Sequence, residues 1–144
     1  MEIFTGLMSQ LKEGLNSELG LIEKIEFFVD KYIGLLEANP YLPLFVINEI
    51  SKDPDRFIDK LKHLGAFPEA ASMVGLMLKA MEEGTIKEYH PFHLFMNIMS
   101  LSVFPFIARP MLVTITGIDE EEWKELMKDR KEEVKRFIFN ALLV

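Results

Sequence analysis

The sequence predicts an all-α fold, a helical bundle of about seven helices that forms one domain over residues 1–144. Apolar residues recur at helical spacing through most of the chain. Capping residues, prolines and glycines separate these apolar runs. The β-branched run at 113–116 has no partner strand elsewhere, so we interpret it as a connector. With 49% hydrophobic residues, a chain of this length can fill one core.

Two helices are predicted at the start of the chain. The first, Glu2–Leu15, has these apolar residues at helical spacing: Ile3, Phe4, Leu7, Met8, Leu11 and Leu15. Because an apolar stripe already begins at the first residues, we expect that the chain was cut from something longer. The second helix is predicted from about Ser17 to Ala38. Asn39-Pro40 ends it, since the residue before a proline disfavours helical geometry.

Three shorter helices are predicted next. The first of them covers Leu42–Ile50. Asp53 followed by Pro54 is typical of an N-cap and a first helical residue, and it starts a helix that reaches about Leu64. Pro68 starts the third, which extends through Glu82. A glycine follows each of the last two helices and is expected to terminate it.

The segment His90–Pro110 is the most apolar part of the chain. It carries no charge from Leu94 to Ala108, and its apolar side chains surround the helix, so it must be buried on every side or lie in lipid. Its fifteen uncharged residues fall short of the ~20 that span a membrane, which favours a protein without membrane contact. A membrane-associated protein is the alternative. Pro105 and Pro110 lack an N–H and are expected to kink or break the helix.

The last predicted helix runs from Asp119, its N-cap, to about Leu142. Glu122 lies three residues after the cap. Its negative charge stabilises the helix there, because the N-terminal end of the helix dipole is positive. Its apolar face is broader than one neighbouring helix needs. Together with the His90–Pro110 helix it could form half of a four-helix interface between two copies. The alternative is that both helices complete the core of a monomer.

Composition excludes several classes of function. A net charge of −7 and a pI near 5.0 argue against nucleic-acid binding by this chain. The absence of cysteine excludes disulfides and thiolate sites, and it fits a cytoplasmic protein. No phosphate-binding loop, GxSxG motif or HExxH motif is present. We therefore predict no catalytic residue, no cofactor and no enzymatic activity.

His90 and His93 are three positions apart and could share a metal ion or haem. Two histidines without a third ligand nearby are weak evidence for such a site. We expect instead that His90 caps the following helix and that His93 is a partly buried hydrogen-bonding residue, so no metal is predicted.

Four segments, in this order, resemble one known family: FFVDKYIGLLEANP, LPLFVINEISKDPDRF, EEGTIKEYHPFHLFMNIMSLSVFPFIARP and GIDEEEWKELMKDRKEEVKRFIFNAL. The most characteristic positions are Asn39, Pro40, Glu49, Gly84, Ile86 and Pro91. Together they resemble the C-terminal effector-binding and dimerisation domain of TetR-family transcriptional repressors, over nearly the whole chain. In that family an N-terminal helix-turn-helix precedes this domain. The present sequence begins at the helix that would join the two, so DNA binding is expected only through that missing domain.

The resemblance implies a homodimer through the last two helices and a cavity for a small hydrophobic or amphipathic effector in each subunit. Effector binding would move the first helix and so change the spacing of two DNA-reading domains. The residues expected to contact the ligand are Phe28, Tyr32, Phe45, Asn48, Met73, Met77, Phe92, Met96 and Met99. Those expected in the dimer interface are Phe95, Leu101, Phe104, Trp123, Arg130, Val134, Phe137 and Ile138. Plain core packing is the alternative for each ligand-contacting residue.

A different class of function also fits the sequence, a helical interaction or scaffold protein that binds no small molecule. The size of the internal cavity discriminates between the two functions. An enclosed cavity of about 300 Å³ or more would favour ligand sensing, whereas a solid core would oppose it.

Overall fold

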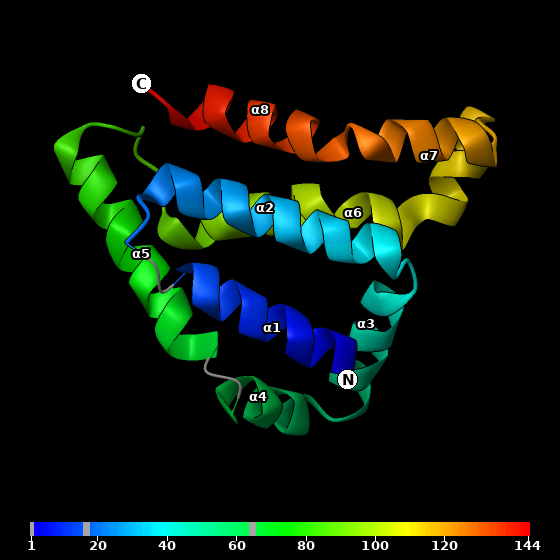
Figure 1. The fold of residues 1–144 in the computed structure, drawn as a ribbon, viewed down its shortest axis with the longest axis horizontal. Helices are drawn as coiled ribbons and strands as arrows, with labels where there is room; N and C mark the ends of the chain where they lie inside the picture. Colours follow the sequence, from blue (N-terminus) through cyan, green and yellow to red (C-terminus); the bar gives the residue numbers. More distant parts are fainter. Residues whose placement is uncertain (1, 16–17, 64–65) are drawn as a thin grey trace.

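The computed structural model describes residues 2–15, 18–63 and 66–144; at 2–4, 7, 11, 14–15 and 66–70 it describes the backbone alone. Over these residues the chain forms eight α-helices and no strand, which confirms the all-α prediction (Figure 1). The helices are α1 (Glu2–Leu15), α2 (Leu21–Ala38), α3 (Leu42–Lys52), α4 (Pro54–His63), α5 (Ala66–Glu83), α6 (Pro91–Thr116), α7 (Glu120–Lys128) and α8 (Arg130–Leu142).

Helix α2 lies at the centre of the bundle. It packs against α1, α5, α6 and α8. Figure 1 shows α7 and α8 end to end along one edge, with α2 and α6 beside them and α1 on the other side of α2. The residues of α2 that form the middle of the core are Leu21, Ile25, Val29, Ile33 and Leu36. Their spacing of three or four positions places them on one helical face, so burial of that face organises the bundle.

The predicted ends of the first five helices agree with the structure to within a few residues. Helix α2 begins at Leu21 rather than near Ser17, which lies outside the described residues. Helix α5 begins two residues before Pro68. Leu64 and the glycine after it, the predicted end of the fourth helix, are also outside the described residues, as are the side chains of most of the predicted apolar stripe of α1. Gly84 follows α5 with a φ of 78°, the left-handed geometry expected after a helix.

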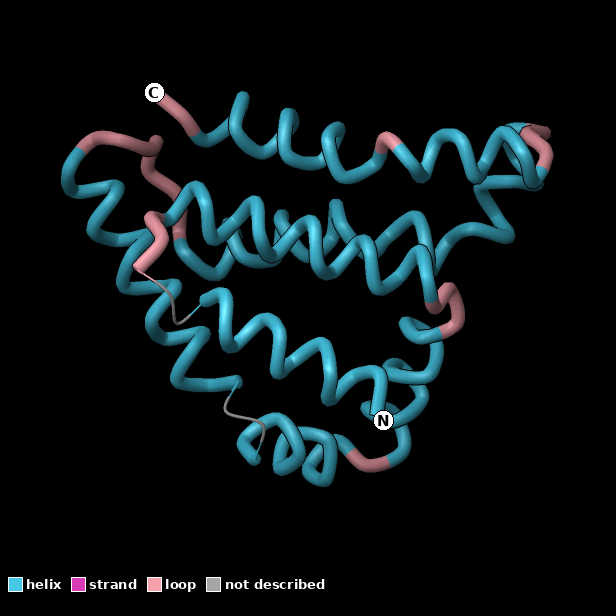
Figure 2. Tube along the Cα trace, in the orientation of Figure 1, coloured by secondary structure: helices cyan, strands magenta, loops and turns pink. Residues whose placement is uncertain are grey.

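Helix α6 differs from the prediction because it does not end at its prolines. It continues through Pro105 and Pro110 for 26 residues, and the predicted connector at 113–116 forms its last turn (Figure 2). Gly117, with a φ of 73°, ends it. Of the two predicted outcomes, a kink or a break, the break is therefore wrong. A proline removes one helical hydrogen bond, and the helix can continue if the freed carbonyl finds another donor.

The last predicted helix is divided in two at Asp129. The N–H of Asp129 donates to the carbonyl of Leu126, three residues back, at 3.2 Å, so the chain makes one tighter turn between α7 and α8. No glycine or proline lies near this position. This is why the described residues form eight helices where the sequence predicts about seven.

The C-terminal end of α8 is tied to the connection between α5 and α6. Lys87 N donates to the carbonyl of Leu142 at 2.8 Å, and the Tyr89 hydroxyl donates to the carbonyl of Ala141 at 2.9 Å. Ile86 and Leu143 form an isolated antiparallel bridge beside them. These contacts hold the end of α8 against the segment that precedes α6. They thereby fix the position of α8 relative to α6.

Candidate functional site

A pocket lies between α2, α3 and α6. Its volume is about 150 Å³, and it is partly open to solvent. The residues that line it are Tyr32, Leu36, Leu42, Pro43, Val46, Ile47, Val103 and Ile107. All except Tyr32 have purely aliphatic side chains, so the pocket can hold an apolar molecule with at most one directed polar contact.

Tyr32 contributes the one polar side chain of this pocket lining. Its ring stacks on that of Phe28, one turn earlier on α2, with centroids 5.5 Å apart and planes 12° apart. Burial of the hydroxyl raises the pKa of Tyr32 above its ordinary value. Within the described part of the chain, this hydroxyl makes no hydrogen bond. Its hydrogen-bonding capacity is therefore open to a molecule in the pocket.

A second hollow is a groove between α6 and α8, with a volume of about 320 Å³. It is lined by Tyr89, Leu94, Asn97, Ile98, Ser100, Leu101, Phe137, Ile138, Ala141 and Leu142. Phe137 of α8, at 64% exposure, borders the groove, and Phe104 of α6 is 51% exposed. Two phenylalanines that exposed are unusual for a surface that meets only water.

Helix α6 also presents apolar side chains to solvent along its length. Those on one face are Phe92, Met96, Phe104, Ile107, Met111 and Ile115. Of the described helices, α6 is the one that is long and apolar enough to cross a membrane, and only 28% of its most apolar window is buried. The sequence predicts that α6 is buried on every side or lies in lipid. In a single copy of the chain, the other helices bury only one side of α6.

Arg130 on α8 compensates for a proline on α6. Pro105 has no N–H, so the carbonyl of Leu101, four residues earlier, lacks its helical donor. Nη2 of Arg130 donates to this carbonyl at 2.7 Å. Burial lowers the pKa of Arg130, an effect that the charge of Glu133 opposes. Arg130, predicted to lie in the dimer interface, thus has a structural contact within its own chain that lets α6 continue past Pro105.

The predicted ligand-contacting residues do not converge on one cavity. Tyr32 lines the 150 Å³ pocket and Phe28 stacks on it. Phe45 and Asn48 are exposed on α3. The methionines of α5 belong to the core, with Met77 buried and Met73 packed against it. On α6, Phe92 and Met96 are exposed and Met99 is half-buried.

Seven residues that line the pocket were not among the predicted contacts. They are the aliphatic residues of α3 and the facing residues of α2 and α6. Their i, i+4 pairs, such as Val103 and Ile107, were visible in the sequence as apolar helical spacing. No sequence signal separated them from ordinary core residues.

The predicted dimer residues divide into an exposed group and a buried group. Phe95, Phe104 and Phe137 are exposed, and Leu101 is half-buried in the groove wall. Trp123, Val134 and Ile138 are buried within the single chain. An apolar helical face can satisfy its burial against the nearest neighbour, here the core of the same subunit. Of these three, Ile138 also lines the groove, and the place of all three in a dimer interface stays a prediction.

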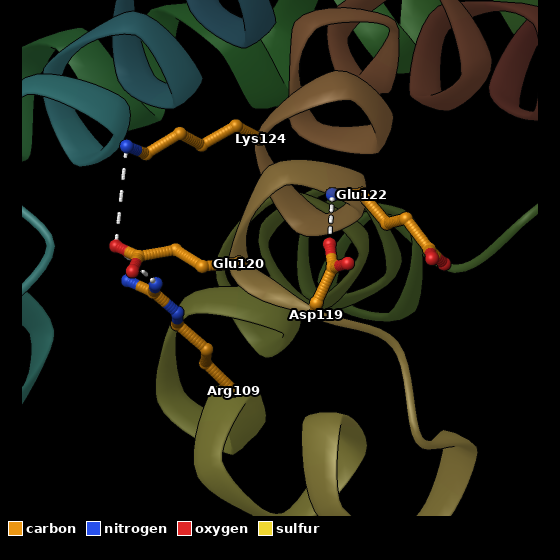
Figure 3. A network of polar contacts seen from close by, with 5 residues as sticks. All are labelled: Arg109, Asp119, Glu120, Glu122 and Lys124. Atoms are coloured by element: carbon orange, nitrogen blue, oxygen red, sulfur yellow. Dashed lines mark hydrogen bonds and ion pairs between the residues drawn. The ribbon is translucent and has the colours of Figure 1, made fainter.

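The junction of α6 and α7 carries a network of polar contacts (Figure 3). Asp119 accepts a hydrogen bond from the N–H of Glu122 at 2.9 Å, which confirms the predicted N-cap. Glu120 lies 3.7 Å from Arg109 and 3.9 Å from Lys124. The Arg109 guanidinium also lies over the Trp123 ring, 5.6 Å from its centroid. These contacts fix the turn between two helices and contain no arrangement typical of catalysis.

The two histidines before α6 have different surroundings. The N–H of Phe92 donates to Nδ1 of His90 at 3.2 Å, so His90 caps α6 as predicted. His93 is exposed rather than partly buried, and its ring meets those of His90 and Phe92 edge-on. Among the residues that the structure describes, no three His, Asp or Glu side chains are grouped to hold a metal ion.

The sequence matches no protein-family model, and no similar protein was found among characterised sequences.

Proposed function

We propose that this chain is the ligand-sensing and homodimerisation module of a TetR-type transcriptional repressor. The observation that carries the proposal is the exposed apolar surface shared by α6 and α8, where Phe137 lines the 320 Å³ groove and Phe104 of α6 is also exposed. The order of helices and the sequence segments that resemble the TetR effector domain also support it. DNA binding is proposed only for a longer protein that carries a helix-turn-helix.

In the proposed dimer, α6 and α8 of each subunit form a four-helix interface around a two-fold axis. Such an interface is self-complementary, so the exposed Phe137 of one subunit can enter the groove of its partner. Complete burial of one phenylalanine side chain contributes about 1.5–3 kcal/mol, and the symmetry doubles each contact. Aromatic side chains next to a pocket are typical of the residues that dominate binding energy.

The pocket between α2, α3 and α6 supports the ligand-sensing part of the proposal. It lies among the helices where the resemblance places an effector cavity, and its apolar lining suits a hydrophobic molecule. Its 150 Å³ is, however, only about half of the smallest volume, about 300 Å³, that is usual for drug-sized ligand sites. That small volume favours the second candidate, a helical interaction protein without an effector, and a ligand titration distinguishes the two.

The substitution Phe137→Asp tests the dimer. A carboxylate on this surface would lose its hydration in an apolar interface, so we expect the variant to be monomeric. Light scattering should give about twice the chain mass of 16.7 kDa for the unmodified protein and about that mass for the variant.

The matched control is Leu44→Asp, on α3, where the side chain is 49% exposed and distant in sequence from α6 and α8. This variant should remain dimeric. A monomeric unmodified protein, or a Phe137→Asp variant that stays dimeric, would contradict the proposed interface.

A further inference from the structure

We infer that the pocket between α2, α3 and α6 binds a single-ring, uncharged molecule that accepts a hydrogen bond from the Tyr32 hydroxyl. Phenol represents this class. The inference builds on the proposed ligand-sensing function and specifies the chemistry of its effector site.

The size of the ligand follows from the volume of the pocket. An apolar cavity of about 150 Å³ is large enough for benzene, and the pocket has this volume. Three helical faces border this partly open pocket: Tyr32 and Leu36 are one turn apart on α2, Val103 and Ile107 are one turn apart on α6, and α3 contributes the remaining residues.

The single polar contact to the ligand is inferred from the burial and the hydrogen bonding of the Tyr32 hydroxyl. A hydroxyl that exchanges water for an acceptor on a bound molecule gains a modest net free energy, and it also fixes the orientation of that molecule. Burial raises the pKa of Tyr32, and its hydroxyl makes no hydrogen bond to the described residues; because this oxygen is not fully buried, water can reach it when the pocket holds no ligand. An acceptor atom on a bound ring would receive a hydrogen bond from this hydroxyl. The rest of the ring would contact the aliphatic part of the pocket lining.

The absence of charge follows from the rest of the lining. Apart from Tyr32, no titratable side chain lines the pocket in the described part of the chain. A carboxylate or an ammonium group would therefore lose its hydration without gaining a partner of opposite charge. The site should select neutral ligands over their charged analogues.

The experiment is a titration of the full chain with phenol, benzene and benzoate, followed by NMR of ¹³C-labelled methyl groups. Phenol should bind saturably and shift the methyl signals of Val46, Ile47 and Val103. Benzene should bind at the same methyl groups about two- to tenfold more weakly, because it cannot accept from Tyr32. Benzoate should give no saturable shift.

Two variants of tyrosine separate the hydrogen bond from the shape of the pocket. Tyr32→Phe should weaken phenol binding to about the affinity of benzene and leave benzene binding unchanged. Tyr41→Phe is the matched control, because Tyr41 is 82% exposed and does not line the pocket. Equal losses for both probes in Tyr32→Phe, or an equal effect of Tyr41→Phe, would overturn the role of Tyr32.

A third variant, Ile47→Trp, fills the pocket from its edge, where Ile47 is 40% exposed and a larger side chain can be accommodated. It should abolish binding of both uncharged probes while the circular dichroism spectrum is retained. Failure of phenol and benzene to bind the folded, unmodified protein would overturn the inference.

The oligomeric state distinguishes this failure from failure of the proposed function. A dimeric protein that binds neither probe would refute the pocket assignment and leave the dimerisation surface in place. A monomeric protein that binds phenol through Tyr32 would refute the dimer and leave the pocket assignment in place.

Discussion

Lys135 on α8 lies between two carboxylates, one of them from the central helix. Its Nζ is 2.9 Å from Asp30 of α2 and 2.9 Å from Glu132 of α8, and its side chain is 12% exposed. Desolvation is the largest single effect and lowers the pKa of Lys135. The hydrogen bonds and charges of the two carboxylates together outweigh it, so the pKa is raised.

These two residues predict how stability changes at alkaline pH. Tyr32 and Lys135 both have raised pKa values in the folded protein, from ordinary values of 10.0 and 10.5. Above about pH 10 the unfolded chain therefore loses these protons first, and the folded state binds more protons than the unfolded state. The contribution to stability is complete below pH 10 and is lost as pH rises through the folded-state pKa values.

Urea denaturation at several values between about pH 9 and pH 12 measures this loss. The free energy of unfolding should fall with rising pH in the unmodified protein. It should fall less steeply in the double variant Tyr32→Phe, Lys135→Met. An unchanged slope in that variant would assign the alkaline loss to other groups.

At the residue scale, local signals predict more than distant contacts. The caps at Asp53, His90 and Asp119 were all predicted, because an N-cap needs only a side chain and the N–H groups two or three positions later. The pairing of Lys135 with Asp30 could not be predicted, since it depends on α2 and α8 lying side by side.

At the element scale, the contact between Arg130 and Leu101 supplies the donor that α6 lacks at Pro105. We expect Arg130→Met to lower the free energy of unfolding by about 1.5–3 kcal/mol, the range for a hydrogen bond that involves a charged group. In a Pro105→Ala background the cost should be smaller, because the alanine N–H can bond the Leu101 carbonyl. Urea denaturation of the four proteins gives the coupling energy.

Arg136→Met is the matched control for this cycle. Arg136 lies on α8 with a side chain that is 74% exposed, and it pairs loosely with Glu133 at 3.9 Å. Such a surface pair contributes little, so this substitution should change stability by less than about 1 kcal/mol in either background. Equal costs of Arg130→Met with and without Pro105 would show that the two residues act independently.

The proline rule misled the prediction for α6 because it considers one helix in isolation. Within a single helix, Pro105 leaves a carbonyl without a donor, and a kink or a break is the expected result. The donor comes from a residue 29 positions away in the sequence. The division between α7 and α8 is a similar case, since neither glycine nor proline marks it and only the backbone geometry at Asp129 reveals it.

At the scale of the whole molecule, the exposed apolar surface of α6 raises the question of whether the protein is surrounded by water or is in contact with a membrane. Its length and composition would allow it to cross a membrane, yet it packs against α2, α3, α5 and α8. We expect the protein to be recovered from an aqueous extract without detergent, as a dimer that covers part of this surface. Recovery only in the presence of detergent would favour contact with lipid instead.

The sequence by itself determined the all-α class, most helix ends and the caps, because these depend on spacing and on neighbouring residues. The tertiary structure decided which apolar faces meet. Hydrophobic attraction has no direction, so an apolar face does not specify its neighbour. Helix α6 shows this most clearly: it is apolar all round, and its periodicity could not show which side is buried. Only packing placed Val103 in the lining of a pocket and left its neighbour Phe104 exposed.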